Sequence, residues 1–172
     1  MPKKPSKQER AHDFRYALGT DLAKAESILR EHPFVLDHPV YGDSESALHY
    51  FATGNQYEIV TWLIAHGANP NGIAEDDRPI HAAAQLGHLE VVRVLAESGV
   101  DLDSTDNLGE TALHKASSGG NLELIDFLLH AGADPSIAEM CGELPVDQAL
   151  PRKAEQVRSL FNKHATSQHN KT

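Results

Sequence analysis

Eleven histidines and one cysteine are the side chains of this 172-residue chain that could support metal or acid–base chemistry. Three of them, His49, His81 and His114, recur at spacings of 32 and 33 residues. Zinc holds its histidine ligands at about 2 Å, whereas residues repeated at this period belong to successive structural units and are too far apart to share one ion. Cys141 has neither a CxxC partner nor a histidine close to it in the sequence, which argues against a metal ligand or an activated nucleophile. We therefore predict a protein that is not an enzyme, with no catalytic residue, no metal and no cofactor.

The spacing of these histidines is part of a longer repeat. The tetrapeptides SALH, RPIH and TALH end at the three histidines, and LPVD ends at Asp147 in the corresponding place. Each histidine is followed nine residues later by an acidic residue and then by a run of Leu, Ile and Val. The segments HGAN, SGVD and AGAD close the three copies. Self-similarity at a period of 20 to 50 residues indicates a solenoid of stacked units.

These units resemble ankyrin repeats, and the resemblance covers residues 10 to 163. The matching motifs are the T-P-L-H-like tetrapeptides, the central GHLEVV and GNLELI, and the terminal GADP. The resemblance implies an all-α ankyrin-repeat solenoid of helix-turn-helix units with β-hairpin-like fingers. We expect the following organisation: a basic disordered tail at 1–9, a degenerate cap at 10–42, full repeats at 43–74, 75–107 and 108–140, a second cap at 141–163, and a disordered tail at 164–172.

Several residues have types that suit the ends of these helices. Ser46 and Thr111 are suited to cap helix N-termini, and Pro79 and Pro145 are suited to a first helical turn. Glycines are expected where a helix ends or breaks: Gly67, Gly87, Gly99, Gly120 and Gly132. The resemblance implies a structural role for the repeated histidines, whose rings would bridge the turns of adjacent repeats.

Charge is unevenly distributed along the chain. Between Glu31 and Pro151 there are 20 acidic and three basic side chains, whereas the two ends together carry 12 basic and five acidic ones. An acidic body repels phosphates, so we expect no direct nucleic-acid binding. It favours a protein partner with a basic surface, although solubility alone would also explain it.

Composition further limits the classes of protein. No stretch approaches the ~20 apolar residues of a membrane span, and no apolar run typical of a secretory signal follows the basic start MPKKPSKQER. A single cysteine cannot form an intramolecular disulfide. We expect a cytoplasmic protein, monomeric on its own, that does not bind a membrane.

The resemblance implies a concave groove, lined by fingertips and first helices, that recognises another protein. The fingertip residues expected to contact a partner are Asp43, Glu45, Glu75, Asp76, Asp77, Asn107, Leu108, Glu110, Met140, Cys141 and Glu143. Those expected on the first helices are Tyr50, Thr53, Gln85, Leu86, Lys115 and Ser118. Apolar residues among carboxylates suit a partner that places Lys or Arg around a hydrophobic hot spot. For any single position, the alternative is a solvated turn.

Two hypotheses of function follow. The first is a non-catalytic protein–protein interaction module that acts by occupying the surface of a partner. The second is a stoichiometric inhibitor or immunity-type protein that masks an enzyme or a nucleic-acid-binding surface, which the short chain and dense acidic charge favour. An adaptor should recruit two ligands, whereas an inhibitor should abolish the activity of one partner at a one-to-one ratio.

Overall fold

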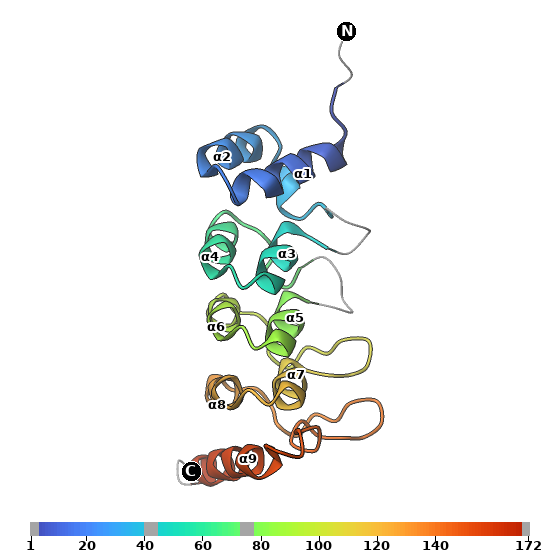
Figure 1. Ribbon diagram of the computed structural model, residues 1–172, viewed down its shortest axis with the longest axis vertical. Coiled ribbons are helices and arrows are strands. Elements are labelled where there is room, and N and C mark those ends of the chain that lie inside the picture. Colours follow the sequence, from blue (N-terminus) through green and yellow to red (C-terminus); the bar gives the residue numbers. More distant parts are fainter. Residues whose placement is uncertain (1–3, 40–44, 73–77, 170–172) are drawn as a thin grey trace.

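The chain folds into a stack of helix pairs (Figure 1). The computed structural model describes residues 4–39, 45–72 and 78–169, the last three by their backbone alone. The elements of these segments are, in order, α1 (Lys7–Leu18), α2 (Leu22–Glu31), the 3-10 helix η1 (Pro33–Leu36), α3 (Ala47–Thr53), α4 (Tyr57–Ala65), α5 (Pro79–Leu86), α6 (Leu89–Glu97), α7 (Ala112–Gly119), α8 (Leu122–Ala131) and α9 (Ala154–His169). There is no sheet among the described residues, so the all-α prediction is confirmed.

The pairs share one orientation. Figure 1 shows α1, α3, α5 and α7 along one side of the stack and α2, α4, α6 and α8 along the other. Two described loops project on the α5–α7 side, at the right of Figure 1. We call residues 104–110 the first finger and residues 137–143 the second finger.

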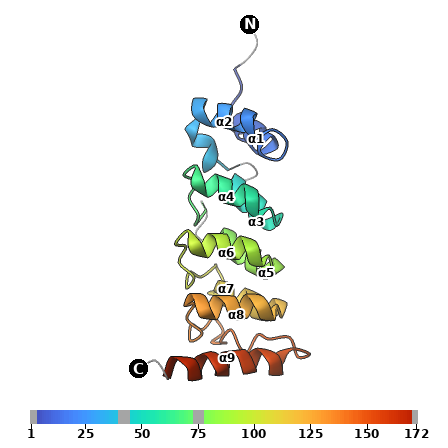
Figure 2. The ribbon, with the colours of Figure 1, turned by 90° about the vertical axis from the view of Figure 1, so that its left-hand side faces the viewer.

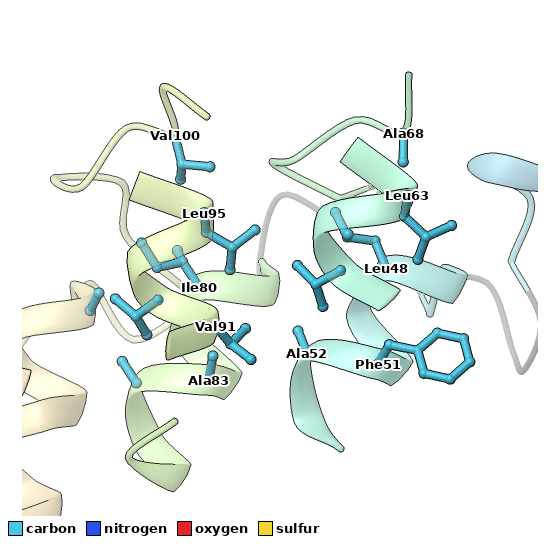
Figure 3. Close-up of a cluster of buried hydrophobic side chains, with 14 of the residues drawn as sticks. Leu48, Phe51, Ala52, Leu63, Ala68, Ile80, Ala83, Val91, Leu95 and Val100 are labelled. Atoms are coloured by element: carbon cyan, nitrogen blue, oxygen red, sulfur yellow. The ribbon is translucent and has the colours of Figure 1, made fainter. Parts of the chain in front are cut away.

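Packing between pairs combines small and large side chains. The first helices bury alanines that allow neighbouring backbones to approach closely, and none of these is more than 1% exposed: Ala47, Ala52, Ala83, Ala84, Ala112 and Ala116. The second helices bury equivalent leucines, Leu63, Leu95 and Leu128, which are fully inaccessible. Figure 3 shows how leucines and alanines of two neighbouring pairs meet. Each buried leucine contributes about 1.5–3 kcal/mol relative to an exposed one.

The break between the two helices of a pair requires a left-handed residue. Gly87 and Gly120 take φ of 75° and 65° at this position, and Asn55 takes φ of 55° in the preceding pair. Asparagine is among the few residues other than glycine that adopt this conformation routinely. The same backbone turn is therefore built from two residue types.

Side chains just after each break bind the preceding repeat. His88 Nε2 lies 3.0 Å from the carbonyl oxygen of Thr53, and Asn121 Nδ2 donates to the carbonyl of Gly87 at 3.2 Å. Lys153 Nζ donates in the same way to the carbonyl of Gly120 at 2.6 Å. These contacts satisfy carbonyls that helix ends leave without an intrahelical partner.

Both ends are more ordered than the sequence analysis expected for 1–9 and 164–172. Helix α1 begins at Lys7 because Ser6 and Glu9 form a capping box: the Glu9 amide donates to Ser6 Oγ at 3.1 Å, and the Ser6 amide donates to Glu9 Oε2 at 2.5 Å. Helix α9 continues to His169. Residues 7–9 and 164–169 are therefore helical.

The second cap differs from the repeats in another way. Pro145 does not begin a helix, and residues 145–153 form turns before α9 starts at Ala154. Pro151 follows six residues after Pro145, and proline disfavours helical backbone in the residue before it. The space between these prolines is too short for the helix that the aligned LPVD segment would otherwise begin.

We predict that Leu128→Ala lowers the free energy of unfolding by about 2–5 kcal/mol, because it leaves a cavity where α8 packs on its neighbours. Stability in stacked repeats is shared across interfaces, so adjacent pairs should unfold with α8. Denaturant melting followed by circular dichroism measures the loss. Glu123→Ala, on the exposed face of the same helix, is the matched control and should cost at most about 1 kcal/mol. Equal melting of the two variants would contradict the stacked core.

Candidate protein-binding site

The two described fingers share one turn geometry. In the first finger the amide of Asp106 donates to the carbonyl of Glu110 at 3.0 Å. In the second finger the amide of Glu139 donates to the carbonyl of Glu143, also at 3.0 Å. Both fingers are therefore hairpin-like loops, 33 residues apart.

The fingers are also bonded to each other. The amide of Met140 donates to the carbonyl of Leu108 at 3.0 Å. The side chains of these two residues remain 75% and 53% exposed. The fingertips thus hold two large apolar side chains in solvent on backbones that are fixed to one another.

A carboxylate closes each finger from inside. Asp106 Oδ1 accepts hydrogen bonds from two amides of its own finger at 2.8 and 2.9 Å, and Glu139 Oε1 does the same at 2.8 and 3.0 Å. The amide hydrogen bonds lower the pKa of Glu139. Sequence reasoning missed both carboxylates, although each stands three residues before a finger glycine, Gly109 or Gly142.

Lys115 joins the first finger to α7. Its Nζ lies 2.6 Å from Asp106 Oδ2 and also forms an ion pair with Glu110, and the three side chains are only 14%, 7% and 15% exposed. Burial disfavours charge on Lys115, but its hydrogen bonds to Asp106 and Glu110 outweigh burial and raise its pKa. Burial likewise acts to raise the pKa of Asp106, but the bonds from Lys115 and the finger amides hold it below its ordinary value. Glu110 and Lys115, both expected to contact a partner, are thus bound to each other within the fold.

An open hollow of ≈ 370 Å³ lies between the first finger, α5 and α7. We call it the finger groove; its lining consists of His81, Ala82, Gln85, Asp106, Asn107, Leu108 and Lys115. Four of these were expected to contact a partner: Gln85, Asn107, Leu108 and Lys115. The groove combines exposed apolar and amide side chains with a buried ion-pair cluster.

Other residues expected at the site have varied positions. Leu86 is 55% exposed and Tyr50 is 37% exposed. Tyr50 lies under Arg15, whose guanidinium carbon is 4.2 Å from the ring centroid. Cys141 and Glu143 are exposed on the second finger.

The hydroxyls of the first helices bond to their own helices. Thr53 Oγ1 donates to the carbonyls of Tyr50 and His49 at 2.8 and 3.2 Å, and Ser118 Oγ donates to that of Lys115 at 3.0 Å. Both are partly exposed. Glu45 Oε1 lies 3.6 Å from His49 Nδ1. The expected acidic contacts Asp43, Glu75, Asp76 and Asp77 lie outside the described residues.

Two of the repeated histidines hold loop carbonyls. His81 Nε2 lies 2.8 Å from the carbonyl oxygen of Ser104, and His114 Nε2 lies 3.2 Å from that of Glu143. His114 Nδ1 accepts the amide of Thr111 at 3.1 Å, so its proton is on Nε2, which donates to Glu143. Both rings are at most 1% exposed. The histidines therefore fix the fingers to α5 and α7.

The glycines expected at helix ends and breaks all have positive φ, between 65° and 102°: Gly67, Gly87, Gly99, Gly120 and Gly132. In the segments the structure describes, no group of three His, Cys, Asp or Glu side chains could hold a metal ion. No described helix combines the length and apolar character needed to cross a membrane.

Comparison with known proteins agrees with this architecture. A family model described as ankyrin repeats (3 copies) matches residues 17–106 and 48–139. The two matches together span more than half of the chain. They include both sides of the finger groove.

Individual relatives share only part of their length with this chain. An interferon antagonist of Vaccinia virus (strain Western Reserve) is 38% identical over 68 residues, which are 40% of this chain and 24% of that protein. A probable E3 ubiquitin-protein ligase of Oryza sativa subsp. japonica is 33% identical over 95 residues, 54% of this chain and 19% of that protein. An ankyrin repeat-containing protein of Schizosaccharomyces pombe is 35% identical over 63 residues, 36% of this chain and 30% of that protein. The aligned segments thus span less than a third of each of these relatives.

We predict that Lys115→Met destabilises the protein by about 1–3 kcal/mol at neutral pH, because two largely buried carboxylates lose their cation. The folded-state pKa of Asp106 is lowered, so its stabilisation is present above its unfolded pKa and is lost as pH falls through the folded value. The gap in melting temperature between wild type and variant should therefore narrow below about pH 4. Thermal melts at stepped pH measure the gap. A gap that stays constant into acid would contradict the ion-pair account.

Proposed function

Because the chain belongs to the ankyrin-repeat family, we propose that it is a protein-binding module whose partner docks in the finger groove. The observation that carries this proposal is the pair of exposed apolar fingertip residues, Leu108 and Met140, held by a backbone hydrogen bond. Large apolar side chains fixed in solvent beside a hollow are typical of interaction sites. The hollow is open and shallow, which suits a protein surface better than a small enclosed ligand.

The rigidity of the groove supports binding through a preformed surface. Asp106 closes the finger, Lys115 ties it to α7, and His81 ties its start to α5. A loop fixed in this way loses little conformational freedom when a partner binds, so more of the contact energy appears as affinity.

We further propose that the partner has a basic surface. The support is the acidic body of the sequence and, among described residues, the exposed Glu143 beside the fingertips. Asp106 and Glu110 contribute less than their number suggests, because Lys115 partly neutralises them. The proposal therefore depends mainly on Glu75, Asp76 and Asp77.

An inhibitor is the second candidate. Proteins named as interferon antagonists, from vaccinia virus and monkeypox virus, are among the relatives of this chain. A module that occupies the groove side of a partner would block that partner without catalysis. Titration of the captured partner distinguishes the roles, since an inhibitor abolishes its activity at a one-to-one ratio.

We predict that Leu108→Ser, which removes an apolar fingertip without touching the buried cluster, weakens partner binding by about tenfold or more. The partner is captured from native host lysate on immobilised wild type, and its affinity is then measured for each variant. Charge reversal of Glu75, Asp76 and Asp77 to Lys should slow association and reduce its salt dependence.

Glu123→Lys, on the outer face of α8, is the matched control and should bind as wild type does. Unchanged binding by Leu108→Ser would contradict the finger-groove proposal. Unchanged binding by the triple reversal alone would contradict only the basic partner.

A further inference from the structure

A second hollow lies on the opposite side of the stack, on the face that Figure 2 turns toward the viewer. It measures ≈ 470 Å³ and lies between the ends of α6 and α8 and the turn that follows α6. We call it the outer hollow. Its apolar floor includes Val100, Leu102 and Phe127, and its acidic side chains are Glu97, Asp101 and Asp103.

The three carboxylates are specific to this repeat. Gly67 and Gly99 end equivalent helices, and the same 32-residue offset relates the positions around them. The equivalent positions one repeat upstream hold Ala65, Asn69 and Asn71. The helix end and its turn are therefore built there without any carboxylate, so the scaffold does not require this charge.

The carboxylates keep their charge available. Asp101 Oδ1 accepts the amide of Asp103 at 3.0 Å, and Asp103 Oδ1 accepts the amide of Asp134 at 2.7 Å, which leaves the second oxygen of each for another donor. Across the residues that the structure describes, neither these two nor Glu97 forms an ion pair. The C-terminal ends of α6 and α8 add the negative ends of two helix dipoles to the same hollow.

The aromatic floor already binds a cation at its edge. The guanidinium carbon of Arg93 lies 4.7 Å from the ring centroid of Phe127. Arg93 Nε also lies 3.6 Å from Glu90 Oε2, so this arginine is shared with another carboxylate outside the hollow. Cations are attracted to aromatic faces, and more strongly where water is excluded. The ring and the three carboxylates therefore favour ligands of the same sign.

We propose that the outer hollow is a second docking surface, for a protein segment in which an arginine or lysine stands beside an apolar side chain. The apolar side chain would cover Val100, Leu102 and Phe127, and the cation would bind among Glu97, Asp101 and Asp103. Charge complementarity selects this occupant, because no described side chain neutralises the three carboxylates. The surface is separate from the finger groove and does not depend on the function proposed for it.

The test is a titration followed by amide chemical shifts in the ¹H–¹⁵N spectrum of the full chain. The probe is the dipeptide acetyl-Leu-Arg-amide, and acetyl-Leu-Gln-amide is its neutral counterpart. The proposal predicts saturable shifts at residues 96–103 and 127–133 with the arginine probe and much weaker ones with the neutral probe. Glu97→Ala with Asp101→Asn and Asp103→Asn copies the upstream repeat, and it should weaken binding by about fivefold.

A charge-matched control removes three exposed carboxylates elsewhere, as Glu26→Gln, Glu123→Gln and Glu155→Gln, and should change affinity by less than about twofold. Equal loss in this control would show bulk charge rather than a site and would overturn the proposal. Equal shifts with both probes, or no saturable shifts at the outer hollow, would overturn it as well. The comparison of probes uses wild type alone, so it decides even if the triple variant folds poorly. Shifts confined to residues 81–85 and 106–115 would support the finger groove instead.

Discussion

Packing of each helix pair on the next is the interaction on which the rest of this structure depends. Leu63, Leu95 and Leu128 are fully buried at equivalent positions, and alanines on the first helices let neighbouring backbones approach closely. A single pair would leave such a face in water, so stability must come from the stack. The histidine, asparagine and lysine that follow the helix breaks add hydrogen bonds across the same interfaces.

The finger groove is a product of that stacking rather than of one repeat. Its walls come from α5 in one pair and from the first finger and α7 of the next. Lys115 holds the finger from α7, whereas His81 holds it from α5. The second finger is fixed in turn by its bond to the first. Binding residues are thus positioned by contacts that also stabilise the fold, and the outer hollow likewise lies between two pairs.

The sequence was sufficient to predict the helix pairs because leucine and glycine repeat at one period, and that period directly reflects stacking. It was not sufficient to predict which carboxylates face a partner. Charge counting treats Asp106, Glu110 and Glu143 alike, but only side-chain geometry reveals that the first two are bound to Lys115. The carboxylates of the outer hollow were missed because they are distinctive only relative to Ala65, Asn69 and Asn71. The extent of α1 was missed although Ser6 and Glu9 have capping-box spacing.

The most direct test of the central claim, that stacking of repeats orders the binding fingers, is native-state hydrogen exchange of the Met140 amide. This amide donates to Leu108 in the neighbouring finger and to no group of its own repeat. We predict that it exchanges at least about tenfold more slowly than an unprotected amide, and that low denaturant accelerates it in step with the core amides of α7 and α8. Exchange at the unprotected rate, while those core amides remain protected, would show that the fingers are not ordered by the stack and would contradict the account.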